Sequence, residues 1–286
     1  MAKSTVYFTK EISSDSLLRI YRTLGVQLKE KAAVKLSTGE PGGHNFLQPG
    51  MIKELVKEVN GTIVECNTAY GGPRSKTKSH WEVMKKHGFL EIAPCDIMDG
   101  EKEIALEIIG GKHLKQNFVG ANLQNYGSVL ILSHFKGHVM GGFGGALKNM
   151  SIGIASAHGK SQIHNAGGFL GISKQNAFLE AMAEACKSVV DYMGSENIVY
   201  INVANRLSVD CDCDSNPAEP KMADIGILAS ADPVAVDQAC VDAVYRSPDE
   251  GKKDLIKRIE SRNGIHTIEA AEILGLGSRE YEIVEI

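Results

Sequence analysis

The chain has 286 residues, 43% of them hydrophobic and 23% charged, which is the composition of a folded protein with a sizeable core. The formal net charge of −4 and the lack of a basic tract argue against nucleic-acid binding, which needs clustered Lys and Arg. No apolar run reaches the roughly 20 residues of a membrane span, and the first residues lack a signal-peptide core, so we expect a cytoplasmic protein with no membrane partner.

Strand-like and helix-like segments alternate along the chain. Apolar patterning predicts strands at 6–9, 32–37, 62–67, 91–98, 126–133, 197–208 and 223–230. Helical spacing and capping residues predict helices at 14–28, 49–60, 76–88, 174–194 and 232–247, with Asp232 as N-cap before Pro233, and two short helices within 251–277. Residues 157–171, rich in Gly and His, are expected to form a loop.

This alternation indicates the α/β class, with a mostly parallel sheet covered by helices on both faces. We treat residues 1–286 as one domain. If the domain divides into two lobes, 1–165 and 166–286, the join lies near 157–175. In such sheets the ligand site lies at the carboxyl ends of the strands. The Gly-rich polar loops at 37–46, 67–74 and 133–145 follow predicted strands, so we expect them to open on one edge.

The stretch 133–156 carries the most chemistry, because it passes from a buried strand through glycines into a helix. Together with a later histidine it supplies these candidates: His134, His138, Gly141, Gly142, Gly144, Gly145, Lys148, Asn149 and His164. Imidazole is a common metal ligand and an acid/base group near neutral pH. A lysine beside free N–H groups at a helix N-terminus suits a phosphate or carboxylate. The alternative is a glycine turn needed for close packing, with solvated histidines at its rim.

Polar residues on the other two loops are weaker candidates. Arg74 is a natural bidentate partner for a substrate carboxylate or phosphate, and a turn in which it meets a surface carboxylate explains it equally well. For Glu40 and His44 we favour a turn with incidental polar residues. His80, on the following helix, faces either the site or solvent.

Six scattered cysteines are too few for a disulfide scaffold in a chain of this length. Most are expected to be buried, inert thiols. Cys211 and Cys213 differ, because alternate residues of a strand would place both thiols on one face, and Asp212 and Asp214 on the other. Thiolates bind zinc or iron, and a redox-active or structural pair is the alternative. The chain has no C-x-x-C-x-x-C run of the ferredoxin type.

Several of these segments together resemble a bacterial and archaeal family called domain of unknown function 362. The resemblance rests on the residues 35–43, 66–74 with His80 following, 87–89, 133–156 and 211–239. Many members of that family carry a ferredoxin-like insert with two four-iron clusters after the region equivalent to 159–168. This chain passes directly into the predicted helix at 174 instead, so the resemblance does not imply such clusters here.

The run from His138 through the glycines to Lys148 and on to His164 is also similar to a stretch of the lactate racemase family that uses a nickel-pincer nucleotide. The resemblance implies that His138 is the acid/base, that Lys148 is the attachment point of a metallo-nucleotide, and that His164 binds the metal. The loops around Glu40 and Arg74 match that family's other site residues only loosely.

We therefore expect a metal-dependent enzyme, an isomerase or oxidoreductase, that moves a proton or hydride on a small anionic substrate. Arg74 and the glycine-loop amides would orient the anion, and His134 or His138 would move the proton. His164 and Lys148 would hold nickel, iron, zinc or a metallocofactor. Two alternatives stay open. One is a metal-binding or redox protein, related to iron–sulfur proteins, that uses Cys211 and Cys213. The other is a module whose glycine loop only captures phosphate.

Overall fold

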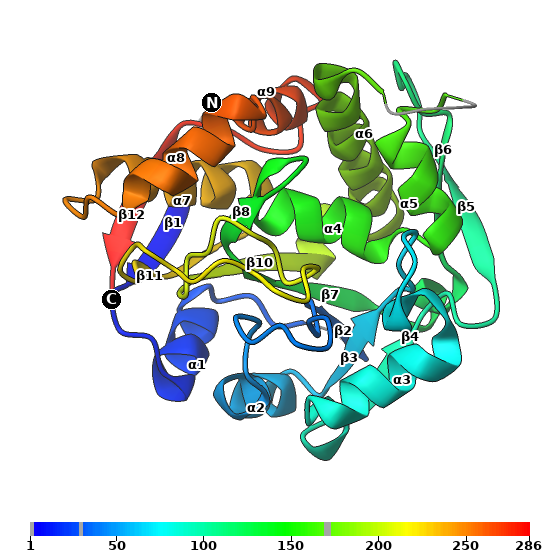
Figure 1. Ribbon diagram of the computed structural model, residues 1–286, viewed down its shortest axis with the longest axis horizontal. Coiled ribbons are helices and arrows are strands. Elements are labelled where there is room, and N and C mark those ends of the chain that lie inside the picture. The colour runs from blue at the N-terminus through cyan, green and yellow to red at the C-terminus, as the bar shows by residue number, and fades with distance from the viewer. Residues whose placement is uncertain (1–2, 29–30, 169–172) are drawn as a thin grey trace.

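The computed structural model describes residues 3–28, 31–168 and 173–286. Within these ranges eight strands form a central sheet with helices on both faces (Figure 1), which confirms the predicted α/β class. The strands lie in the order β12 (Tyr281–Glu285), β1 (Ser4–Thr9), β11 (Gly226–Ser230), β10 (Ile198–Ala204), β7 (Ser128–His134), β2 (Ala32–Lys35), β3 (Gly61–Glu65) and β4 (Cys95–Ile97).

The sheet is mostly parallel, as predicted. From β10 through β7, β2 and β3 to β4, every neighbouring pair is parallel, and so is the pair of β1 with β12. Only β11 runs against its neighbours, β10 and β1. The edge strand β12 was missed by the sequence prediction, because its residues are mostly exposed and show no buried face.

Helices cover the two faces of the sheet in separate groups (Figure 1). One face carries α1 (Ser14–Thr23), α2 (Pro49–Glu58) and α3 (Thr77–Lys86). The other carries α4 (Ala146–Ile154), α5 (Ala157–His164), α6 (Gln175–Met193), α7 (Pro233–Arg246), α8 (Lys252–Ser261) and α9 (Ile265–Ile273). Short 3-10 helices lie at Pro73–Ser75, Phe89–Glu91, Ala121–Asn125 and Ser195–Asn197.

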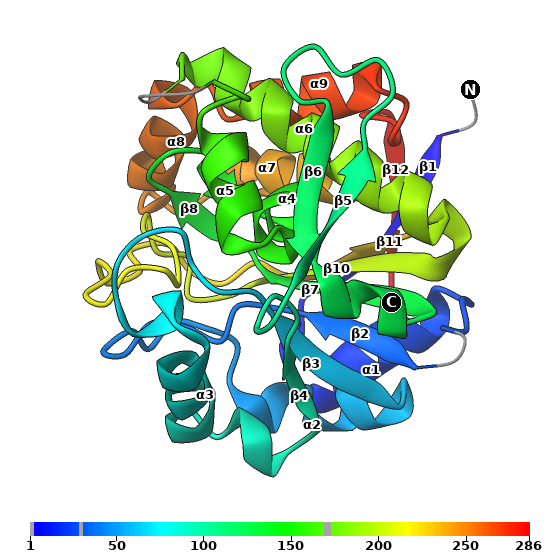
Figure 2. The same ribbon diagram turned by 90° about the vertical axis from the view of Figure 1, so that its right-hand side faces the viewer.

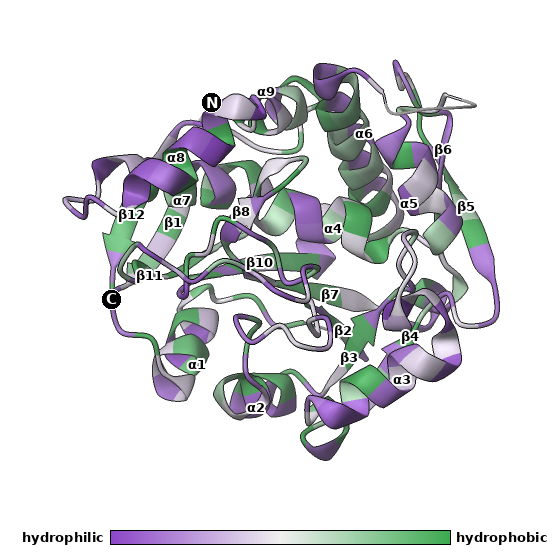
Figure 3. Ribbon diagram, viewed as in Figure 1, coloured by the Kyte–Doolittle hydropathy of each residue, from purple (hydrophilic) through white to green (hydrophobic). Residues whose placement is uncertain are grey.

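The apolar run of β7 serves two cores at once. Val129 and Ile131 pack into the core under α4, α6 and α7, whereas Leu130 and Leu132 pack into the core under α1 and α2. Successive side chains of a strand point to opposite faces, so a strand covered on both faces must be apolar throughout. The helices α1, α2 and α3 mix hydrophobic and hydrophilic residues (Figure 3), and their buried residues, such as Leu17, Ile52 and Met84, belong to the core on their side of the sheet.

Local signals account for the helix ends that the sequence predicts. Asp232 caps α7 by accepting hydrogen bonds from the N–H groups of Val234 and Ala235, and α2 begins at Pro49. The predicted loop at 157–171 is wrong in its first half. Ser156 accepts a hydrogen bond from the N–H of Gly159 and so starts helix α5. Residues 169–172 of that prediction lie outside the described residues.

Two antiparallel hairpins stand outside the main sheet, and neither was predicted. The first, β5 (Glu103–Glu107) with β6 (Gln116–Gly120), runs beside α5 and α6 (Figure 2). The second, β8 (Lys136–His138) with β9 (Gly142–Gly144), is the start of the glycine-rich segment. At Gly142 the backbone φ is +83°, and a Cβ there would lie 2.9 Å from Cα of Gly264, so the hairpin requires glycine at this position.

Strands from both sides of the predicted lobe boundary alternate in the one main sheet. β7 pairs with β10, and β1 pairs with β11 and β12. The division into two lobes stays a prediction, and its join at 157–175 includes residues outside the described ranges. None of the helices in the described part of the chain has the length and hydropathy needed to cross a membrane.

Candidate active site

The loops that follow β2, β3, β7 and β10 meet at the carboxyl edge of the sheet, as the parallel arrangement predicts. They enclose a cavity of about 180 Å³. Its walls come from the ends of β2 and β3, the loop that carries Tyr70 and Arg74, the β8–β9 hairpin, α4, α5 and Cys213. Most of the residues that the sequence marked as candidates therefore surround one small space.

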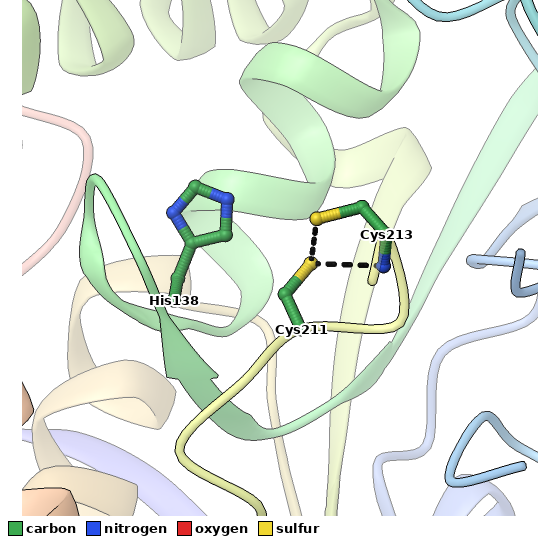
Figure 4. Close-up of side chains that lie close together, drawn as sticks. All are labelled: His138, Cys211 and Cys213. Atoms are coloured by element: carbon green, nitrogen blue, oxygen red, sulfur yellow. Dashed lines mark hydrogen bonds between the residues drawn. The ribbon is translucent and has the colours of Figure 1, made fainter. Parts of the chain in front are cut away.

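A histidine and two cysteines meet at this cavity (Figure 4). One nitrogen of His138 and the sulfurs of Cys211 and Cys213 all lie within 4.8 Å of one another, and the two sulfurs are 2.7 Å apart. The predicted strand for the cysteines is wrong, because residues 205–225 contain no strand. A turn joins the thiols instead, with the N–H of Cys213 donating to Sγ of Cys211 at 3.3 Å.

The two thiols of this pair differ in acidity. The hydrogen bond from Cys213, together with the nearby Lys148 and His138, holds the pKa of Cys211 well below its usual value despite burial. The same hydrogen bond and burial raise the pKa of Cys213 well above its usual value. These opposite shifts mean that Cys211 loses its proton more readily than Cys213, which donates its hydrogen to the sulfur of Cys211.

Lys148 lies in the first turn of α4, and its Nζ is 3.9 Å from Sγ of Cys211. Burial alone would lower the pKa of Lys148, but the neighbouring Cys211 and Cys213 outweigh it and the pKa is raised. Lys148 is therefore a cation beside the sulfur pair, in the position that the sequence expected for a group that attracts an anion or holds a cofactor.

His138 and His164 both line the cavity, with opposite ring nitrogens engaged. Nδ1 of His138 accepts a hydrogen bond from the N–H of Gly141 at 2.8 Å, so the neutral ring carries its hydrogen on Nε2. Nδ1 of His164 lies 2.6 Å from the carbonyl of Lys160, so that ring carries its hydrogen on Nδ1 and has a free lone pair on Nε2. Burial lowers the pKa of both, that of His164 to about 4, so both are neutral near pH 7.

The donor set of two thiols and an imidazole suits zinc, nickel or iron. A tetrahedral zinc would hold two thiolates about 3.8 Å apart, so the sulfurs of Cys211 and Cys213 would have to separate by about 1 Å. His138 would bind through Nε2 only if the amide of Gly141 turned away from Nδ1. His164 already has the tautomer that a metal requires, although it lies outside the group of three. The residues fit such a metal in their chemistry, with these local movements.

The amides at the start of α4 are not free for a ligand. The carboxylate of Asp237, on α7, accepts hydrogen bonds from the N–H groups of Ala146 and Leu147 at 2.7 and 2.9 Å. A Cβ on Gly145 would lie 2.3 Å from this carboxylate, so Gly145 makes room for it. Burial raises the pKa of Asp237 to about 6, against the effect of its hydrogen bonds from Asn202 and the two amides. Asp237 thus occupies the place that the sequence assigned to a substrate anion.

Asn149 uses its side chain within the fold. Its Nδ2 donates to the carbonyls of Lys35 and Leu132 and lies 3.1 Å from Oγ of Ser133. These contacts join the ends of β2 and β7 beneath the cavity. Asn149 therefore lines the cavity with its donors already engaged.

Arg74 is held by two buried carboxylates. Its Nε donates to Glu40 at 2.8 Å, its Nη1 to Glu65 at 3.2 Å and its Nη2 to the hydroxyl of Tyr70 at 3.0 Å. Glu65 also pairs with Lys35 at 2.8 Å. Burial would raise the pKa of Glu65, but Lys35 and Arg74 lower it to about 2. Glu40, which the sequence treated as incidental, is thus a structural partner of Arg74.

His134 is also fixed by neighbours. Its Nδ1 lies 2.7 Å from Asp212 and its Nε2 lies 2.7 Å from the carbonyl of Asn205. Lys136 pairs with the same carboxylate at 2.8 Å. Both ring nitrogens of His134 therefore contact oxygen acceptors, and neither is free to exchange a proton with a ligand. These bonds attach the loop that carries Cys211 to the end of β7.

The sequence prediction missed one buried residue near the site, and it left open whether a second, His80, faces the site or solvent. Lys160, on α5, lines the cavity and donates to the carbonyl of Ala155 at 2.5 Å, and burial lowers its pKa. His80 is buried between α3 and β3, bonded through Nδ1 to Asn67 at 3.2 Å, and burial lowers its pKa to about 4. Lys160 lies in a segment that was expected to be a loop. The only sequence signal that could have made it a candidate is its position between His158 and His164.

Buried lysines, histidines and a cysteine pair surround a cavity at the strand ends, which is where α/β sheets commonly place a small ligand. The chain belongs to the family described as "Domain of unknown function (DUF362)", whose model matches residues 32–242. That range contains every residue lining the cavity.

No curated protein matches the chain in sequence. Among solved structures, the lactate racemase apoprotein from Thermoanaerobacterium thermosaccharolyticum is similar, with a TM-score of 0.49 and 13% identity over 83% of this chain and 56% of the racemase. A protein from Thermotoga maritima is similar with a TM-score of 0.46 and 11% identity, over 81% of this chain and 58% of the other. The chain therefore spans little more than half the length of these two proteins.

Proposed function

We propose that the protein is a metal-dependent enzyme that acts on a small anionic substrate by proton or hydride transfer, as an isomerase or oxidoreductase. One observation carries the proposal. Three donors of metal-binding type, from His138, Cys211 and Cys213, lie within 4.8 Å of one another at a cavity whose other walls carry lysines. Soft ligands beside positive charge are what an enzyme needs to hold both a metal and an anion.

Each residue has a distinct role in this proposal. Cys211 and Cys213 would hold the metal, which when bound supplies a Lewis acid that polarises a substrate oxygen. The nitrogen ligand would come from His138 or His164, and the other histidine would take or give the proton. His164 has the better-placed lone pair, since its Nε2 has no hydrogen-bond partner in the described part of the chain. Lys148 would attract the anion or, as the nickel-pincer resemblance implies, carry a metallo-nucleotide.

The test is the metal content of protein purified without oxygen and loaded with zinc, nickel or iron. We expect one metal per chain, which Cys211→Ser and Cys213→Ser should both lose. The matched control is Cys95→Ser, which should keep the metal because Cys95 lies in β4 and does not line the cavity. His138→Ala and His164→Ala then identify the nitrogen ligand, because only one of them should lose the metal. A wild-type protein that binds no metal, or serine variants that keep it, would overturn the proposal.

A redox function is the second candidate, and the short distance between the sulfurs favours it. At 2.7 Å, Cys211 and Cys213 are closer than two ligands of one metal would be. A disulfide or peroxide oxidant would accept two electrons and two protons from the dithiol and leave a disulfide. Intact mass after such treatment should fall by two hydrogens, and Cys213→Ser should abolish this loss. A metal-free protein that oxidises in this way would replace the first proposal.

The third candidate, a module that only captures phosphate at the glycine loop, has less support, because Asp237 fills the start of α4. We also propose a reducing compartment, the cytoplasm, as the place of action. All six cysteines are unpaired, although two of them lie side by side.

A further inference from the structure

We propose that the substrate is a compact dianion, either a small dicarboxylate or a phosphate monoester, held between Lys148 and Lys160. This inference rests on the proposed function, since it assumes that the cavity takes an anion. It goes further by naming the charge of that anion and the two residues that recognise it.

The argument begins with the cations around the cavity, which are Lys35, Arg74, Lys136, Lys148 and Lys160. Three of them have carboxylate partners. Lys35 pairs with Glu65, Arg74 with Glu40 and Glu65, and Lys136 with Asp212. Three cations thus stand against three buried carboxylates, and this part of the site is electrically balanced.

Lys148 and Lys160 are left over. Within the described ranges, no carboxylate lies at ion-pair distance, 4.0 Å or less, from either ammonium group. Lys160 donates one of its three N–H groups to the carbonyl of Ala155. The hydrogen-bond partner of Lys148 in the described ranges is the sulfur of Cys211 at 3.9 Å. They come from consecutive helices, α4 and α5, and both line the cavity.

The sulfur pair does not cancel this charge once a metal is bound. Two thiolates and a divalent cation sum to zero, so a loaded site keeps the positive charge of Lys148. An anion beside Lys160 would favour the charged form of that lysine against the effect of burial, which lowers its pKa. Buried charges without partners are costly, and a ligand of opposite charge removes that cost. A dianion balances both lysines, whereas a monoanion or a neutral molecule leaves at least one of them unpaired.

The size of the cavity limits the ligand. The cavity has a volume of about 180 Å³. That is below the ~300 Å³ at which drug-sized ligand sites begin. We therefore expect a substrate of few heavy atoms, such as a small dicarboxylate or a phosphorylated small acid.

The experiment measures binding of three probes to the metal-loaded protein by calorimetry at constant ionic strength: malonate, inorganic phosphate and acetate. We expect malonate or phosphate to bind at least about tenfold more tightly than acetate. The tighter of the two shows whether the substrate is a dicarboxylate or a phosphate monoester. Lys160→Met and Lys148→Met should each weaken the dianion about tenfold and remove its advantage over acetate. Lys53→Met, at an exposed position of α2, is the matched control and should change nothing.

The outcomes separate this inference from the proposed function. The dianion inference is wrong if acetate binds as tightly as the dianions, or if dianion binding survives both methionine substitutions. Either result leaves the proposed anion-binding enzyme in place. If the metal-loaded protein binds none of the three probes, the proposed function is wrong in its claim of an anionic substrate. The metal content and the unfolding midpoint of Lys160→Met are measured in parallel. Values equal to those of the wild type show that a loss of binding does not come from a loss of fold.

Discussion

Around one cavity, charged residues of the same types stand in two different situations. On the side of β2 and β3, Lys35, Glu65 and Arg74 are bound to one another at 2.8 to 3.2 Å and are almost entirely buried. On the side of α4 and α5, Lys148 and Lys160 meet only a sulfur and a carbonyl. The first group holds the loops in place, and the second has donors left for a ligand.

The same contrast divides the two histidines of the glycine-rich segment. His134 has both ring nitrogens bound to oxygens of the loop after β10, whereas His138 keeps Nε2 for the sulfur pair. Residue type and loop position therefore do not identify the functional residues. Contacts within the protein separate the residues that are held in place from those with donors left over, and these contacts become visible only in three dimensions.

The largest expected effect comes from breaking the paired group. Glu65→Gln removes the charge that balances Lys35 and Arg74, and two buried cations are left with too few partners. The free energy of unfolding should fall by about 3 to 5 kcal/mol, measured by denaturant titration. Glu58→Gln, which breaks the exposed pair with Arg22, is the control and should leave stability nearly unchanged. Similar losses in both variants would refute the contrast between the two groups.

An intermediate effect is expected at Asp237, whose carboxylate is paired with amides and, among the described residues, has no cation at ion-pair distance. Its pKa is raised by burial to about 6 in the folded protein, above its ordinary value of 3.8. The folded state therefore binds this proton more tightly, and its stabilising effect is present below pH 4 and lost as pH rises through 6.

Asp237→Asn removes this titration, so the comparison of the two proteins isolates it. The stability of the wild type relative to Asp237→Asn should fall by about 2 kcal/mol between pH 4 and pH 7. Urea titrations at several pH values measure the difference. If the two proteins have parallel pH profiles, the carboxylate is ionised throughout this range. The hydrogen bonds to Asp237 would then lower its pKa by as much as burial raises it.

The smallest effect on stability is expected for Lys148→Met. Since this lysine has no carboxylate partner in the described chain, its removal should leave the free energy of unfolding within about 1 kcal/mol of the wild type, or raise it. The same substitution should remove anion binding. A loss as large as that of Glu65→Gln would place Lys148 among the structural cations.

Much of the fold could be predicted from local patterns. The apolar run of β7, the Pro at the start of α2 and the Asp232 cap of α7 are short-range signals, and each one led to an element that the structure contains. The position of the cavity followed from the rule for parallel strands. The hairpin of β8 and β9 and the helix α5 were missed because glycine and histidine marked both segments as loops.

The partners of the site residues could not be predicted, because they come from distant parts of the chain. Asp212, expected on the face opposite to the thiols, reaches His134 and Lys136. Asp237 reaches the start of α4 across 90 residues of sequence. Neither contact leaves a periodic pattern, and each decides whether a neighbouring group is free. The roles of His134, His138, His164 and Arg74 therefore depended on contacts that no local signal records.

The pairing of β1 has a consequence for the order in which the chain folds. Its only sheet neighbours in the described structure are β11 and β12, and more than 200 residues separate Thr9 from Gly226. At 5 to 20 residues per second, a ribosome takes roughly 10 to 40 s to produce the first of these partners. The first strand to leave the ribosome must wait, with Val6 uncovered, while β2, β3 and β7 can already assemble the middle of the sheet.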